Sequence, residues 1–91
     1  MAFELRNKTA LITGATDGLG RLLAINLAKQ GVKVIVHGRS SEKAEELIRE
    51  LDGLNSLQNE FVICDLNEVG KVNQVFGKVK QLDILVNNAG V

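Results

Sequence analysis

The chain has 91 residues, enough for one domain at most, and 45% of them are hydrophobic and 24% charged. Eleven basic residues balance eleven acidic ones. Nucleic-acid and anionic-membrane surfaces need an excess of cations, so neither kind of partner is expected. The single cysteine, Cys64, cannot form an intrachain disulfide. The amino terminus has neither signal-peptide nor transit-peptide character, and no apolar run is long enough to span a membrane. We therefore expect a cytoplasmic protein.

The first predicted element is a buried strand over residues 8–13, because an apolar run there stops at a glycine. A helix over residues 18–30 should follow. Its leucines recur at four-residue spacing and predict a stacked apolar stripe of Leu19, Leu23 and Leu27. Gly31 is expected to end this helix, as glycine commonly does at a helix carboxyl terminus.

A second strand is predicted over residues 32–37, where β-branched residues are frequent. Ser41 is expected to cap the next helix, with Glu42 favourable in its first turn. The apolar positions of that helix share one face and are Ala44, Leu47, Ile48 and Leu51. Residues 52–59 read as a polar loop, and residues 61–64 as a third strand.

Asn67 can cap a third helix, and residues 83–86 form a fourth predicted strand. The apolar face of the third helix consists of Val72, Val75, Phe76 and Val79. Strands that alternate with helices predict a parallel, Rossmann-type α/β sheet with right-handed crossovers, helices on both faces and strand order 3-2-1-4. The first two helices should cover one face. Much of the other face and the fourth-strand edge should then stay bare, which predicts self-association.

The first strand leads into Thr13-Gly14-Ala15-Thr16-Asp17-Gly18-Leu19-Gly20, a glycine-rich turn that opens a helix. Gly14 permits a sharp turn, Gly18 lets a pyrophosphate approach the backbone, and Gly20 lets the helix pack close to the sheet. The free N–H groups at the helix start would then face the phosphates. The turn predicts dinucleotide binding, although such a sequence can also be a plain tight loop. No Gly-Lys-Ser/Thr follows, which excludes a P-loop.

The residues after the second strand bear on the choice of cofactor. NAD-binding domains usually carry an acid here for the ribose 2′-OH, whereas an arginine suits a 2′-phosphate. The sequence has Gly38-Arg39-Ser40 without an acid. Arg39 can form a forked contact to a phosphate, and Ser40 can add a hydroxyl. These residues favour NADP, with NAD as the alternative, and the nearby Asp17 weakens that preference.

Taken in order, the glycine-rich turn, Arg39, the pair Asp65-Leu66 and residues 87–90 (Asn-Asn-Ala-Gly) resemble the short-chain dehydrogenase/reductase family along the whole chain. The resemblance implies that Asp65 hydrogen-bonds the adenine amino group beside the Leu66 backbone. It also implies that residues 88–90 line the adenosine ribose and that Asn87 helps to hold the central strand. The predicted cofactor-binding residues are Gly14, Thr16, Asp17, Gly18, Leu19, Gly20, Arg39, Ser40, Asp65, Leu66, Asn88, Ala89 and Gly90.

The family's chemistry uses a Tyr-x-x-x-Lys pair and a Ser later in the chain, and this sequence has no tyrosine. The resemblance therefore implies the cofactor half of an oxidoreductase, residues 1–91, without catalytic residues. The alternative is a non-catalytic half-Rossmann module that binds nucleotide or oligomerises. His37 is predicted to be structural because it ends a buried strand, and Cys64 because it is a small buried hydrophobic residue. These two residues alone cannot form a metal site, which needs three or four ligands.

Overall fold

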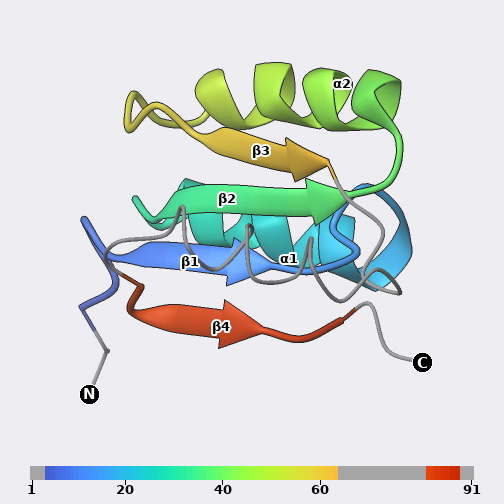
Figure 1. Cartoon of the computed structure of the whole chain (residues 1–91). Coiled ribbons are helices and arrows are strands. Elements are labelled where there is room, and N and C mark those ends of the chain that lie inside the picture. Colours follow the sequence, from blue (N-terminus) through green and yellow to red (C-terminus); the bar gives the residue numbers. More distant parts are fainter. Residues whose placement is uncertain (1–3, 64–81, 89–91) are drawn as a thin grey trace.

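The computed structural model describes residues 4–63 and 82–88, whose strands form one parallel sheet in the order β3-β2-β1-β4 (Figure 1). This is the predicted Rossmann-type order. The strands all point toward one edge of the sheet, here called the carboxyl edge (Figure 1). The elements, in chain order, are β1 (Thr9–Ile12), α1 (Gly18–Lys29), β2 (Lys33–Gly38), α2 (Ser41–Asp52), β3 (Glu60–Ile63) and β4 (Ile84–Val86).

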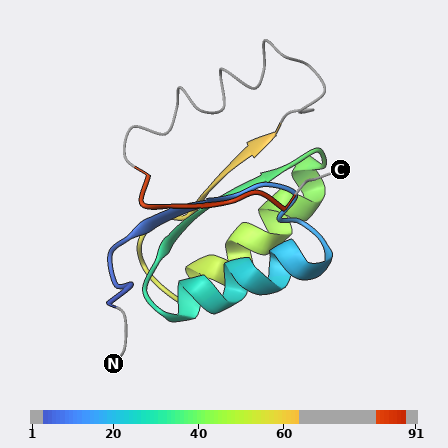
Figure 2. The same ribbon diagram turned by 90° about the horizontal axis from the view of Figure 1, so that it is seen from below.

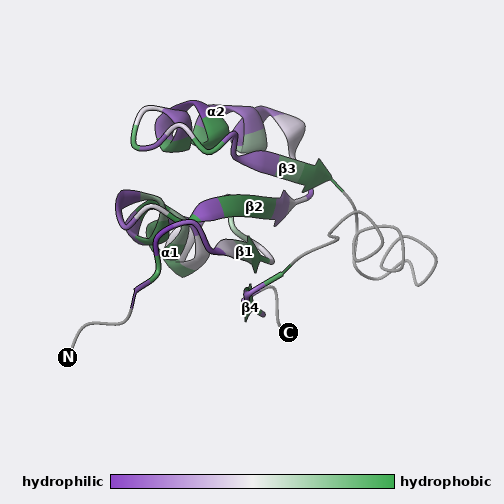
Figure 3. Cartoon of the chain, turned by 90° about the vertical axis from the view of Figure 1, so that its left-hand side faces the viewer, coloured by the Kyte–Doolittle hydropathy of each residue, from purple (hydrophilic) through white to green (hydrophobic). Residues whose placement is uncertain are grey.

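The inner strands are apolar because their side chains are buried on both faces of the sheet. β1 pairs with β2 and with β4, so that Ile12 lies beside Val36 on one side and Val86 on the other. Ala10, Leu11 and Ile12 are all fully buried. Figure 3 shows the corresponding hydrophobic colouring through the middle of β2, whereas hydrophilic colouring predominates on α2.

The buried face of α1 differs from the predicted leucine stripe. The residues that pack flat against the sheet are Gly20, Ala24 and Ala28, which also recur at four-residue spacing. Leu23 and Leu27 flank this row and are half-buried, but Leu19 is 64% exposed, so its placement in the stripe was wrong. Small side chains decide this orientation because they let the helix axis approach the sheet more closely than leucines do.

Gly31 ends α1 as predicted. Its φ of 82° is a conformation that glycine adopts without penalty. The Gly31 N–H donates to the carbonyl of Ala28, and the Val32 N–H donates to that of Leu27. These two bonds form a Schellman motif, which satisfies the last carbonyl groups of the helix and directs the chain into β2.

α2 begins one residue earlier than predicted. Ser40, not Ser41, is its N-cap, and the Ser40 side chain accepts a hydrogen bond from the Lys43 N–H at 3.3 Å. Ser41 is instead the first helical residue. The predicted apolar face is confirmed, since Ala44, Leu47 and Leu51 are buried and Ile48 is half-buried. An ion pair between Arg21 and Glu50 also joins α1 to α2.

Both helices cover the same face of the sheet, as predicted (Figure 2). On the opposite face Leu11 is fully buried and Ile35 is 7% exposed, so the centre of that face is not bare. Leu85 on the β4 edge is 51% exposed. Self-association remains a prediction. The predicted third helix lies outside the described residues, and no described helix is long and apolar enough to cross a membrane.

A network of asparagines closes the amino edge of the sheet, in the segment predicted to be a polar loop. The buried Asn59 accepts a hydrogen bond from the Val34 N–H at 2.8 Å and donates to Asp52 and Asn55 at 3.0 and 3.1 Å. The Asn55 side chain in turn donates to the carbonyl groups of Ala28 and Val32. Polar residues here replace the backbone partners that a regular element would supply.

Candidate nucleotide-binding site

The glycine-rich turn lies at the carboxyl edge, between the end of β1 and the start of α1. Gly14 and Gly18 have φ values of 60° and 56°, so both need the left-handed conformation. A Cβ built on Gly18 would meet no atom within 4 Å. The space above Gly18 is therefore open, which is what close approach of a phosphate to this backbone requires.

Gly20 is the point at which α1 touches the turn. A Cβ at this position would lie 2.6 Å from the Gly14 carbonyl oxygen and 2.5 Å from Nδ2 of Asn88. The first of these is a backbone atom, which cannot rotate away. Glycine is therefore required by the close contact between the helix and the turn, whereas the sequence predicted a close contact between the helix and the sheet.

His37 of β2 forms two hydrogen bonds with the glycine-rich turn. His37 is buried, at 3% exposure, and its Nδ1 accepts a hydrogen bond from the Gly14 N–H at 3.1 Å. The His37 carbonyl oxygen accepts a second bond from the Ala15 N–H at 2.9 Å. The predicted structural role is thus specific, because one residue of β2 fixes two consecutive peptide groups of the turn.

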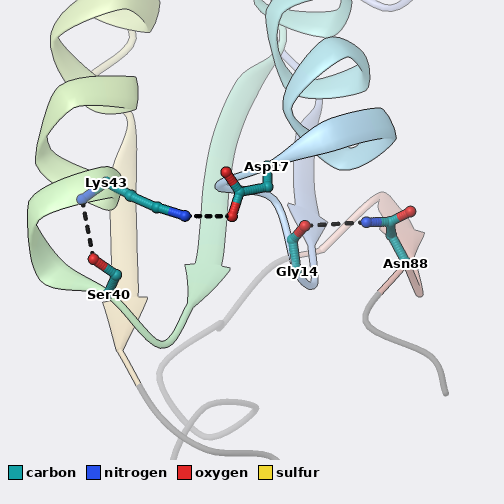
Figure 4. Close-up of polar contacts among 5 residues, drawn as sticks. All are labelled: Gly14, Asp17, Ser40, Lys43 and Asn88. Carbon is teal, nitrogen blue, oxygen red and sulfur yellow. Dashed lines mark hydrogen bonds and ion pairs between the residues drawn. The ribbon is translucent and has the colours of Figure 1, made fainter.

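Thr13 connects the turn to the residues that follow β4. Its backbone N–H donates to the Val86 carbonyl, and its hydroxyl accepts from the Asn88 N–H at 2.9 Å. The hydroxyl proton can be donated to Asn87 Oδ1, 3.2 Å away. The Asn88 side chain donates to the Gly14 carbonyl at 3.0 Å (Figure 4). Two predicted site residues, Gly14 and Asn88, are therefore in direct contact.

Asp17 and Lys43 form an ion pair across the gap between the turn and α2. The Lys43 ammonium lies 2.8 Å from Oδ2 of Asp17 (Figure 4). The same Lys43 donates its backbone N–H to Ser40 (Figure 4). The Ser40 hydroxyl oxygen, predicted to contact a phosphate, thus accepts the capping hydrogen bond of α2 and keeps its proton for donation.

Arg39 follows β2 at the same edge. Its side chain is exposed and forms no ion pair with another described residue. Gly38 lies directly against Thr16, since a Cβ on Gly38 would be 2.6 Å from Cγ2 of Thr16. The turn and the end of β2 are therefore packed together, and the Arg39 guanidinium group is free to reach a ligand beside them.

Four predicted site residues, Asp65, Leu66, Ala89 and Gly90, lie outside the described residues. Sequence reasoning missed the contact of Lys43 with Asp17, one of the predicted site residues. A signal was present, because a cation in the first turn of a helix opposes the helix dipole and needs a partner elsewhere. The described residues contain no group of three or more potential metal ligands.

A parallel sheet whose carboxyl edge carries a glycine-rich strand-to-helix turn is typical of nucleotide-binding α/β proteins. The family model for short chain dehydrogenases matches residues 8–91. The chain therefore belongs to the short-chain dehydrogenase/reductase family, as its motifs implied. It also carries the family's parallel sheet, with the first four strands in the expected order.

Two individual relatives are consistent with this family assignment. The chain is 39% identical over 95 aligned residues to the uncharacterized oxidoreductase YvaG of Bacillus subtilis (strain 168), covering 100% of this chain and 35% of that protein. It is 40% identical over 88 residues to the 3-oxoacyl-[acyl-carrier-protein] reductase FabG of Staphylococcus aureus (strain Mu50). This match covers 92% of this chain and 36% of that protein. The chain thus spans about a third of the length of these relatives.

Among solved structures, a short chain dehydrogenase of Escherichia coli CFT073 complexed with NADPH superimposes with a TM-score of 0.79 and 29% identity. The match covers 97% of this chain and 40% of that one.

Proposed function

We propose that the chain forms the dinucleotide-binding portion of a short-chain oxidoreductase and that its carboxyl edge binds NADP(H) in preference to NAD(H). One observation carries the proposal. The turn at Gly14–Gly20 leaves open space over Gly18 at the start of α1. Arg39, which forms no ion pair with another described residue, follows the neighbouring strand. Helix N–H groups suit a pyrophosphate, and a guanidinium group suits a 2′-phosphate.

The charged residues near the end of β2 favour binding of NADP(H) over NAD(H). No acid stands at Gly38 or Arg39 to accept a hydrogen bond from a ribose 2′-OH. Asp17 belongs to the turn at the start of α1 and not to the end of β2, so its charge acts on the pyrophosphate that both dinucleotides share. The NADPH complex of the Escherichia coli relative adds to this support.

The experiment is calorimetric titration of NADP⁺ and NAD⁺ into the intact protein and its Arg39→Ala variant at fixed salt. A hydrogen bond to a charged group contributes about 1.5–3 kcal/mol. The variant should therefore bind NADP⁺ about 10- to 150-fold more weakly and NAD⁺ nearly as well as before. Arg49→Ala, which removes an exposed cation from the last turn of α2, is the matched control and should change neither affinity.

Equal losses for both dinucleotides in Arg39→Ala would contradict the NADP preference. They would show that Arg39 stacks on the adenine or only orders its loop. A wild-type protein that binds neither dinucleotide would contradict the whole proposal.

A further inference from the structure

Asp17 occupies the N-cap of α1 but does not cap it. Its φ of −139° and ψ of 161° are the extended values typical of a cap residue. An aspartate here usually accepts a hydrogen bond from an N–H of the first turn, yet Asp17 makes no such bond. Its carboxylate instead accepts from Lys43 of α2, at 2.8 Å (Figure 4).

The consequence is a helix start without a bound carboxylate. α1 has no acidic residue in its first turn, and the first N–H groups of any α-helix lack acceptors within the helix. These groups lie next to the open space over Gly18. Had Asp17 turned back to cap the helix, its negative charge would occupy the position that a phosphate needs.

The ion pair is poorly suited to stabilise the fold. Its lysine and aspartate side chains are 54% and 69% exposed, and exposed pairs contribute little to stability. Lys43 also stands in the first turn of α2, where the helix dipole disfavours a cation. The arrangement is better explained by its effect on Asp17 than by the stability of α2.

We infer that Lys43 is a positioning residue of the proposed dinucleotide site. It draws the Asp17 carboxylate off the start of α1, which leaves the helix N–H groups free for the pyrophosphate, and it offsets a charge that would repel that group. This inference rests on the proposed function. Because NAD and NADP share the pyrophosphate, Lys43 sets the affinity for both, whereas Arg39 sets the choice between them.

The test is Lys43→Gln in the intact protein. Asp17 should then cap α1, and the dissociation constants of NADP⁺ and NAD⁺ should rise by the same factor, about 2- to 30-fold, which is the equilibrium equivalent of one N-cap interaction. Lys43→Arg should retain the wild-type affinity for both dinucleotides, because arginine can also pair with Asp17. In an Asp17→Ala background, Lys43→Gln should have little further effect.

Lys33→Gln is the matched control. Lys33 also pairs with a carboxylate, that of Glu60 at 2.9 Å, but it lies at the start of β2, remote from the turn. This variant changes the net charge equally and should leave both dissociation constants unchanged. If Lys33→Gln lost as much dinucleotide affinity as Lys43→Gln, net charge alone would explain the effect of Lys43→Gln. That result would overturn the inference.

Amide hydrogen exchange without nucleotide supplies an independent readout. In Lys43→Gln the first-turn amides of α1 should exchange more slowly, because Asp17 now accepts from one of them. Unchanged exchange, or weaker binding of NADP⁺ alone, would overturn the role assigned to Lys43. The second outcome would place Lys43 on the 2′-phosphate instead. A wild-type protein that binds no dinucleotide would overturn the proposed function and with it the ligand named here.

Discussion

Nδ1 of His37 accepts a hydrogen bond from the backbone N–H of Gly14 at 3.1 Å, so a buried residue of β2 orders the turn that follows β1. An acceptor at Nδ1 means that the proton of the neutral ring is on Nε2. The residue is therefore part of the support of the proposed site, although it lies beneath the surface that a ligand would contact.

Substitutions of His37 should separate this hydrogen bond from simple packing. His37→Phe fills the space but leaves the Gly14 N–H without its acceptor. It should lower the free energy of unfolding by about 1–3 kcal/mol and weaken dinucleotide binding. His37→Asn places an amide oxygen near the position of Nδ1 and should keep more of the stability and more of the dinucleotide affinity than His37→Phe does. Urea denaturation and calorimetry measure the two effects, and equal behaviour of the variants would argue against the hydrogen bond.

Gly20→Ala should disrupt the turn. The new methyl group would lie 2.6 Å from the Gly14 carbonyl oxygen, so the helix must shift, which costs about 1–3 kcal/mol of stability in overpacked sites. Gly53→Ala is the control. Its backbone is right-handed helical with φ of −76°, and the nearest atom to a new methyl group is 3.4 Å away. Thermal unfolding should show a lower midpoint only for Gly20→Ala; equal midpoints would refute the close contact.

A change of cofactor preference through Gly38 should need a second substitution. Gly38→Asp offers an acceptor for the ribose 2′-OH, but its Cβ would collide with Cγ2 of Thr16 at 2.6 Å. The single variant should be destabilised. Adding Thr16→Ala removes the colliding methyl group and should restore stability while favouring NAD⁺ over NADP⁺. Titration of both cofactors and thermal unfolding measure these effects. A Gly38→Asp variant that is as stable as the wild type and binds NAD⁺ tightly would contradict the predicted collision with Thr16.

Asn59→Ala should affect stability without affecting the proposed site. It leaves the Val34 N–H without its acceptor at the amino edge and should lower the free energy of unfolding by about 1–3 kcal/mol. Dinucleotide affinity, measured well below the unfolding transition, should stay unchanged because the turn lies at the opposite edge. A selective loss of NADP⁺ binding in a fully folded variant would show that the two edges are coupled.

The sequence was sufficient for the order of elements and for the strand order, because alternating apolar runs and right-handed crossovers restrict a parallel sheet to few topologies. It was insufficient for the orientation of α1, where alanines and Gly20 compete with leucines that have the same spacing. It also could not show the Asp17–Lys43 pair or the Asn88–Gly14 contact. These join residues 26 and 74 positions apart, and their geometry depends on the assembled sheet.

The most direct test of the proposed site is the location of the bound cofactor. Backbone amide signals of the isotope-labelled protein should be followed by NMR as NADP⁺ is added. The account predicts that the signals of Gly14, Gly18, Gly20 and Arg39 move and saturate, while those of the amino edge, such as Asn55 and Asn59, stay in place. Saturable shifts confined to the amino edge, or none at millimolar NADP⁺, would contradict it.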